Sequence, residues 1–181
     1  MGIPFIPVRG ILGSHYFSIQ PRFKVMKCPF SGHEVVVVEA IVPDYTVIHA
    51  FKADSKGNVL IDKHSDVDLA VQAAKVAIAT VEEIVSEGEL VPDKKSRLMS
   101  RMNFHAIVPV PFGAHPTGCP GYYSLDRDHL KQYVKMAGNK KSFKSYLKKY
   151  VYDLSDHNEY VKVVKEEGWS SSPVAGKRQK N

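Results

Sequence analysis

The chain has 181 residues, of which 44% are hydrophobic and 24% charged, and its formal net charge is +6. This composition is typical of a globular protein with one core and excludes an intrinsically disordered chain. The apolar runs are short, and none approaches the roughly 20 apolar residues of a membrane-spanning helix.

The first thirty residues contain four prolines and show little periodicity. They predict a rigid loop whose apolar side chains need other structure to pack on, rather than a strand or a capped helix. The terminus also lacks the basic region and long apolar region of a signal peptide.

Two strands are predicted next. The β-branched run at residues 33–42 indicates a strand buried on both faces along much of its length, and residues 46–52 form a second strand that ends at a turn containing Gly57 and Asn58. His49 lies inside the second apolar run, where a core histidine with satisfied hydrogen bonds is the expected role.

A helix and a strand then follow directly on one another. Ser65 or Asp66 is the predicted N-cap, and small residues from Leu69 to Ala74 form a narrow packing face. After Lys75 the pattern becomes β-branched, so residues 76–85 are predicted as a strand. This order is typical of the returning half of an α/β unit.

Glu82 and Glu83 lie side by side on that predicted strand. Because side chains alternate across a strand, the two carboxyl groups point to opposite faces and cannot serve one site together. The expected role of one of them is structural, buried and bonded to the backbone at a strand end.

The last predicted strand, Ala106–Val110, leads into three amphipathic helical segments. Their apolar residues fall at residues 130–137, 143–151 and 155–168, with Ser155 as the cap of the third helix and Gly168 as its end. One domain is therefore predicted over residues 1–168, followed by a flexible basic tail at residues 169–181.

Between the last strand and the helices lies an unusual loop, PVPFGAHPTGCPGYYSLD, at residues 109–126. Four prolines and three glycines between Pro109 and Tyr123 exclude a helix or a central strand. The loop also carries His115, two residues after Gly113 and directly before Pro116. That placement suits a residue that positions a ligand, or one that holds the shape of the loop through a backbone bond.

A second loop, PVRGILGS, occupies residues 7–14. Gly10 and Gly13 could present backbone N–H groups to a carbonyl or carboxylate oxygen, and Arg9 could pair with an anion. The structural alternative is a turn with Arg9 in a salt bridge.

The cysteines indicate the cellular compartment of the protein, and the distribution of lysines indicates which kinds of partner it could bind. Two cysteines, Cys28 and Cys119, make neither a disulfide framework nor a metal cluster, so a reducing cytoplasm is expected with no metal and no cofactor. Seven lysines and no acid lie at residues 131–150. Because no nucleic-acid-binding signature accompanies them, a solvated helix face is the favoured interpretation, followed by steering of an anionic ligand.

Four segments together resemble a known family: GIPFIPVRGILGS, PDYTVIHAFKADSKGNV, AAKVAIATVEEIV and VPFGAHPTGCPGYY. They are similar to the A (alpha) subunit of family I coenzyme A transferases of the glutaconate CoA-transferase type, from about Gly2 to Tyr133. The resemblance implies an open mixed α/β sheet flanked by helices. It also implies that the N-terminal half of the subunit is missing, either because this chain is a fragment or because a split gene places that half on another chain.

The resemblance further implies a division of labour. The nucleophilic glutamate of the family belongs to the B subunit, beside a Ser-Glu-Asn-Gly-like signature that this sequence lacks. No catalytic residue is therefore expected here. Arg9, Gly10, Gly13, Ser14 and His115 match family segments that border the acyl pocket, and coenzyme A is a substrate rather than a cofactor.

Two alternative functions remain open at this stage. Relatives of this fold in steroid degradation open a ring of an acyl-CoA substrate with water, and this chain could be one component of such a hydrolase. The third possibility is a non-catalytic orphan half-domain.

Overall fold

The computed structural model describes residues 2–170 of the chain. The elements are β1 (Phe5–Val8), α1 (His15–Ile19), β2 (Phe23–Lys27), β3 (Glu34–Glu39), β4 (Tyr45–Asp54), β5 (Val59–Asp62), α2 (Val67–Ala73), β6 (Val76–Val85), β7 (Ser96–Met99), the 3-10 turn η1 (Arg101–Asn103), β8 (Ala106–Pro109), α3 (Arg127–Ala137), α4 (Lys140–Leu147), the π-helical turn η2 (Lys148–Tyr152) and α5 (His157–Glu166). This confirms the α/β class. Among the described residues, no helix is long and apolar enough to cross a membrane.

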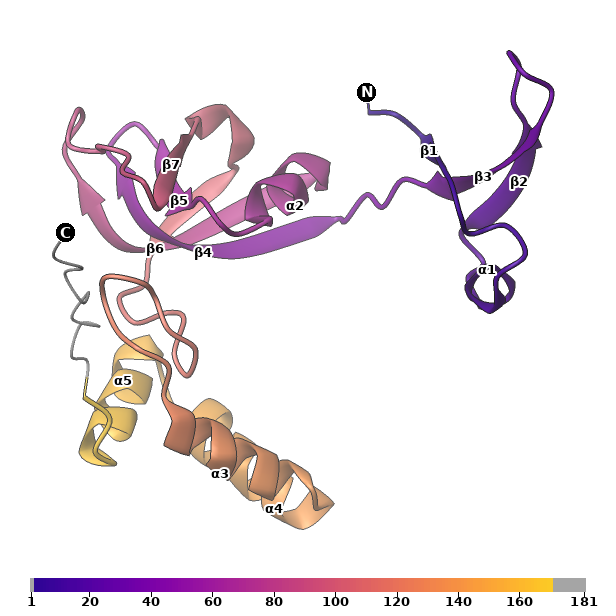
Figure 1. The fold of residues 1–181 in the computed structure, drawn as a ribbon. Helices are drawn as coiled ribbons and strands as arrows, with labels where there is room; N and C mark the ends of the chain where they lie inside the picture. Colours follow the sequence, from indigo (N-terminus) through magenta and orange to yellow (C-terminus); the bar gives the residue numbers. More distant parts are fainter. Residues whose placement is uncertain (1, 171–181) are drawn as a thin grey trace, which may run out of the picture.

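The strands divide between two sheets rather than forming one (Figure 1). An antiparallel sheet has the order β1-β3-β2, and a mixed sheet has the order β7-β5-β4-β6-β8. In Figure 1 the small sheet and α1 lie well apart from the mixed sheet, and the segment between β3 and β4 joins them.

The prediction of an irregular loop for the first thirty residues is wrong. β1 pairs with one side of β3 and β2 pairs with the other, so Val36 at the centre of β3 is 2% exposed. Pro7 is tolerated because β1 is an edge strand, and a proline there removes no hydrogen bond that the sheet needs.

The mixed sheet holds the core. β4 runs parallel to β6, which runs parallel to β8, while β5 and β7 add antiparallel strands at the other side. The predicted strands β4, β6 and β8 are confirmed, whereas β5 and β7 were not predicted. Small and β-branched residues fill the core, in a cluster formed by Ile48, Ala50, Ala53, Val59, Ile61, Val71, Ala77, Ala79, Val81 and Met99.

The helices at the C-terminal side begin and end largely where the sequence indicates. The exception is the cap of α5, because Asp156, and not Ser155, accepts the hydrogen bond from the backbone of Glu159. Gly168 ends this helix with a φ of 98°, as predicted. Trp169, which the sequence assigned to the tail, packs against Phe112 and Tyr123. Residues 171–181 of the predicted tail lie outside the described residues.

Candidate functional site around the loop after β8

The loop after β8 is a packed structure rather than an open surface segment. Its backbone leaves the sheet through the bond from Val110 N to Val81 O, at 2.7 Å. Phe112 then takes a φ of 64°, a left-handed conformation that a bulky residue adopts only when its surroundings enforce it. An isolated antiparallel β-bridge between the backbones of Cys119 and Tyr123 closes the loop further along the chain.

Helix α5 covers the loop from the C-terminal side. His157 Nε2 lies 2.7 Å from the carbonyl oxygen of Pro111, and Lys165 Nζ lies 4.4 Å from the centre of the Phe112 ring. The Trp169 ring packs 4.3 Å from the ring of His115, centroid to centroid. These contacts join the end of the described chain to a segment about fifty residues earlier.

His115 lies inside this junction, with 0% of its side chain exposed. Its Nδ1 lies 2.7 Å from Tyr160 Oη and its Nε2 lies 3.1 Å from Asp126 Oδ2. Burial lowers the pKa of His115, although Asp126 opposes the shift. Both ring nitrogens are bonded to side chains, so this arrangement fits the loop-shaping alternative, with side chains in place of the backbone partner that the sequence analysis considered.

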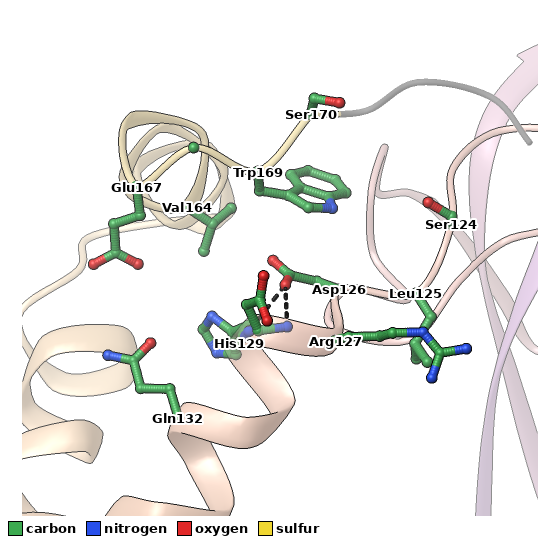
Figure 2. Close-up of a pocket in the computed structure, with 12 residues that line it drawn as sticks. Ser124, Leu125, Asp126, Arg127, His129, Gln132, Val164, Glu167, Trp169 and Ser170 are labelled. Carbon is green, nitrogen blue, oxygen red and sulfur yellow. Dashed lines mark hydrogen bonds between the residues drawn. The ribbon is translucent and has the colours of Figure 1, made fainter.

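Asp126 connects the loop to α3 and borders a cavity of about 380 Å³ (Figure 2). As the N-cap of α3 it accepts hydrogen bonds from the backbone of Asp128 and of His129. Burial opposes ionisation, but the bond from the His129 backbone and the bond from His115 hold the pKa of Asp126 below its usual value. His129 and Trp169 line the same cavity.

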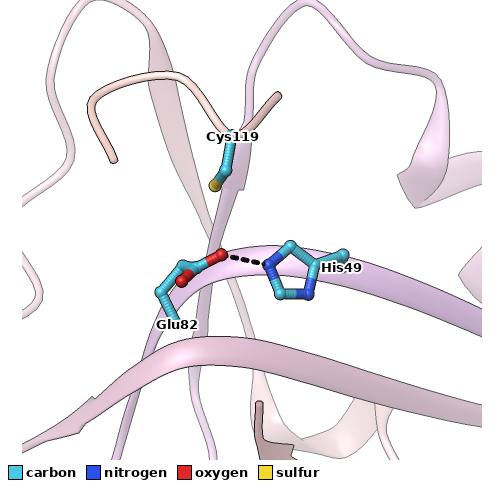
Figure 3. A group of neighbouring side chains, drawn as sticks. All are labelled: His49, Glu82 and Cys119. Carbon is cyan, nitrogen blue, oxygen red and sulfur yellow. Dashed lines mark hydrogen bonds and ion pairs between the residues drawn. The ribbon is translucent and has the colours of Figure 1, made fainter. Parts of the chain in front are cut away.

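The buried carboxyl group that secures the loop is that of Glu82 (Figure 3). Its Oε1 lies 2.6 Å from His49 Nε2 and accepts a bond of 2.7 Å from Tyr123 Oη, while its Oε2 accepts a bond of 2.7 Å from Phe112 N. Burial disfavours the ionised form, but these hydrogen bonds outweigh it and lower the pKa of Glu82. Glu82 is thus the structural, backbone-bonded carboxyl group that the sequence predicted.

The directions of the surrounding hydrogen bonds can be assigned. Tyr123 Oη accepts from Ala114 N, so its own proton points to Glu82. Thr80 Oγ1 donates to the carbonyl of Ile48, so it accepts the proton on His49 Nδ1. Every group in this chain of bonds has a partner, and His49 is the satisfied core histidine that the sequence predicted.

Cys119 lies beside the hydrogen-bond network of Glu82, but its thiol is not reactive. It is 3% exposed, and burial together with the charge of Glu82 raises its pKa to about 12. The ligand atoms of His49, Glu82 and Cys119 lie within 4.8 Å of one another. A thiol binds a metal only as the thiolate, and burial keeps the Cys119 thiol protonated, so we assign this group a packing role.

Gly113 is required by the same packing. A Cβ at this position would lie 2.8 Å from the carbonyl oxygen of Val110 and 2.9 Å from His49 Cε1. Only glycine therefore lets the loop backbone lie directly against the His49 ring.

Glu83 points to the opposite face, as the strand pattern predicted. It forms an ion pair of 2.5 Å with Lys52 and accepts a bond of 2.8 Å from Tyr122 Oη, and 44% of its side chain is exposed. Lys52 and Tyr122 also line a largely apolar cavity of about 690 Å³, together with Phe51, Lys95 and Leu125.

The first predicted loop lies elsewhere in the fold. Gly10 and Gly13 have φ values of 78° and 79°, and Ser14 caps α1 by accepting from Phe17 N. This loop belongs to the small sheet, which Figure 1 places apart from the loop after β8. The chain therefore does not bring Arg9, Gly10, Gly13 and Ser14 together with His115, and their role at an acyl pocket stays a prediction.

Sequence reasoning missed several partners in the site. Tyr160, His157 and Trp169 each lie more than forty residues after the loop residue that they contact, and no local pattern connects them to it. Tyr122 and Tyr123 gave the one usable signal, because paired tyrosines in a Pro-Gly loop need buried hydrogen-bond partners.

Comparison with known proteins shows which family has this architecture. A family model described as coenzyme A transferase matches residues 1–108. The A (alpha) subunit of glutaconate CoA-transferase from Acidaminococcus fermentans is 36% identical over 179 residues, which cover 89% of this chain and 56% of the relative. The crystal structure of that enzyme superposes with a TM-score of 0.77, at 33% identity, over 90% of this chain and 56% of the matched chain.

Two further relatives differ in their stated activity. The A (alpha) subunit of 3-oxoadipate CoA-transferase from Pseudomonas knackmussii is 35% identical over 91% of this chain and 58% of its own length. A cholesterol ring-cleaving hydrolase subunit from Mycobacterium tuberculosis is 30% identical over 86% of this chain and 59% of its own length. This chain thus spans a little over half the length of these relatives. It belongs to the coenzyme A transferase family.

Proposed function

We propose that this chain is an A-subunit component of a CoA-transferase, which moves coenzyme A between an acyl-CoA and a carboxylic acid. The observation that carries the proposal is the similarity to the A (alpha) subunits of two CoA-transferases over about nine tenths of the chain. The compartment proposed is the cytoplasm, and the partners are proteins and acyl-CoA rather than nucleic acid or a membrane.

The reaction needs a nucleophile from elsewhere. In the proposed cycle the acyl-CoA thioester is attacked by a glutamate of the B subunit, which forms an acyl-glutamyl anhydride and releases the CoA thiolate. The thiolate then attacks the glutamyl carbonyl, which frees the first carboxylate and leaves an enzyme-CoA thioester. A second carboxylate reverses both steps and departs as the new acyl-CoA. No cofactor takes part.

Glu82 does not compete for that role. Its side chain is 3% exposed and its two oxygens are held by His49, Tyr123 and Phe112. What this chain supplies is the wall of the pocket. We propose that the loop with Arg9, Gly10, Gly13 and Ser14 borders the acyl group, and that His115 acts by fixing the shape of the loop after β8.

One edge of the mixed sheet supports the further proposal that another segment docks on this chain. β5 pairs with β4 only through Lys52 and Ala53, so along residues 45–51 the side of β4 that faces away from β6 has no strand partner among the described residues. Tyr45 and Val47, on one face of this stretch, are 70% and 64% exposed. Unpaired backbone and exposed apolar side chains in a parallel sheet are typical of a missing strand and its covering helix.

We therefore propose that a chain carrying the N-terminal half of the subunit pairs with β4 at residues 45–51. The experiment is co-expression of this chain with that half and a B subunit, followed by an assay of CoA transfer between carboxylic acids. Transfer by the three-part complex, and none by this chain alone, is the expected result. A complex that binds acyl-CoA but transfers it to no acid tested would overturn the transferase proposal.

A ring-opening hydrolase is the second candidate, because one relative is named as part of a ring-cleaving hydrolase. A transferase accumulates a covalent enzyme-CoA thioester when the acceptor acid is withheld, whereas a hydrolase that uses water directly does not. Intact-mass measurement of the complex after incubation with acyl-CoA separates the two. The orphan half-domain is favoured only if no combination of partner chains yields either activity.

A further inference from the structure

The junction between the loop after β8 and α3 gathers three side chains of the kind that hold a transition metal. One ring nitrogen of His115, one of His129 and a carboxylate oxygen of Asp126 lie within 4.8 Å of one another. All three residues are largely shielded, since His115 and His129 are 8% and 5% exposed and the Asp126 side chain is 14% exposed. We propose that these three residues form a binding site for one divalent transition-metal ion, with Zn²⁺ as the best match.

The second bonds of the two imidazoles support this assignment. His115 Nδ1 lies 2.7 Å from Tyr160 Oη, and His129 Nε2 lies 2.8 Å from Tyr146 Oη. A histidine that binds a metal through one nitrogen usually donates the other N–H to an oxygen, which fixes its tautomer and orientation. Here each ring has such an oxygen, and Nδ1 of His129 has no hydrogen bond to any described residue.

Metal binding would replace one hydrogen bond of the cluster. His115 Nε2 and Asp126 Oδ2 are hydrogen-bond partners, so an ion bound to both atoms would take the place of the proton that they share, while the other nitrogen of each ring keeps its tyrosine partner. The forms that bind the ion are the neutral imidazole and the carboxylate.

The spacing of the ligand atoms and the cavity beside them also fit a bound Zn²⁺ ion. His115 Nε2 and Asp126 Oδ2 are 3.1 Å apart, close to the roughly 3.4 Å that separates two ligands at tetrahedral Zn²⁺ with bonds of about 2.1 Å. Asp126 and His129 line the cavity of about 380 Å³ shown in Figure 2, which leaves room for a water molecule as fourth ligand. Two nitrogens and one oxygen favour Zn²⁺ over Mg²⁺ or Ca²⁺, which prefer oxygen ligands.

The proposed ion is structural. It would join residue 115 of the loop to the first turn of α3 and so stabilise the packing under α5. The proposal concerns this chain alone and is independent of CoA transfer. The spacing of the three residues along the sequence matches no common metal motif, which is why the sequence predicted no metal.

The test uses the full chain, freed of metal with a chelator and titrated with Zn²⁺ by calorimetry and with Co²⁺ by visible absorption. Asp126→Asn removes the charged ligand but keeps an N-cap residue for α3, and His129→Gln removes a nitrogen ligand. Matched controls are Asp156→Asn, at the N-cap of α5, and His64→Gln, at an exposed histidine.

We expect one equivalent of Zn²⁺ to bind, with a rise in Tm, and Co²⁺ to show a tetrahedral spectrum. Both site variants should weaken binding by at least about tenfold, and both controls should leave it unchanged. If the wild-type chain binds no stoichiometric ion, or if Asp126→Asn and His129→Gln bind it as the wild type does, the site is overturned and the cluster is only a hydrogen-bonded junction.

Discussion

At the scale of single residues, Glu82 and Glu83 can be compared directly, because one of these adjacent carboxyl groups is buried and the other is partly exposed. Glu82→Gln would place an amide N–H₂ among three donors, from His49, Tyr123 and Phe112. The free energy of unfolding should fall by about 3 kcal/mol, as when one member of a buried ion pair is lost. Glu83→Gln is the control and should cost less than about 1 kcal/mol, since its ion pair is partly exposed. Urea denaturation of both variants measures the difference, and equal losses would contradict the assigned roles.

The same residue predicts a dependence on pH. The pKa of Glu82 lies below its ordinary value of 4.5 in the folded chain. A carboxyl group with a lowered folded pKa stabilises the fold above its unfolded pKa, and this contribution disappears as the pH falls through the folded pKa. The stability difference between wild type and Glu82→Gln should therefore be constant at neutral pH and shrink below about pH 4.5. A difference that grows on acidification would show that Glu82 is protonated in the native state.

At the scale of elements, the free side of β4 allows a direct test of docking. Val47 is 64% exposed and belongs to the unpaired stretch of β4, so Val47→Lys should barely change the stability of this chain alone. In the complex it would bury an unpaired ammonium group against the incoming segment, which should weaken assembly by at least about tenfold. Val151→Lys, at another exposed valine on η2, is the matched control. Co-purification with the chain carrying the N-terminal half measures the effect, and equal recovery of both variants would contradict docking at β4.

The elements also show how far the sequence could predict the fold. Strands β3, β4 and β6 carry long β-branched runs, so their local pattern suffices. β1 contains a proline and β7 reads Ser-Arg-Leu-Met, and these strands exist because neighbouring strands pair with them. Short strands of this kind have no pattern of their own and depend on tertiary pairing.

The features of the candidate site likewise divide into those that the sequence predicts and those that depend on tertiary packing. That Glu82 and Glu83 face apart follows from strand geometry alone and was predicted. That Glu82 bonds to Phe112, thirty residues later, and His115 to Tyr160, forty-five residues later, depends on how the elements pack. The loop was recognised from its composition, but its partners could not be found without the structure.

At the scale of the whole molecule, the final prediction concerns where the reactive carboxylate lies. In the complex with the N-terminal half and a B subunit, incubation with acyl-CoA and no acceptor acid should add the mass of CoA to the B subunit while leaving the mass of this chain unchanged. The reason is physical, since Glu82 is enclosed by three donors and Glu83 is held by Lys52 and Tyr122. Glu83→Gln in this chain should therefore leave the adduct intact. His115→Ala should slow turnover by loosening the loop without abolishing the adduct, because the imidazole has no exposed surface through which it could react with a substrate. Intact-mass spectra of the separated chains decide the point. An adduct on this chain, or its complete loss in a folded His115→Ala complex, would mean that this chain supplies a reacting group of its own.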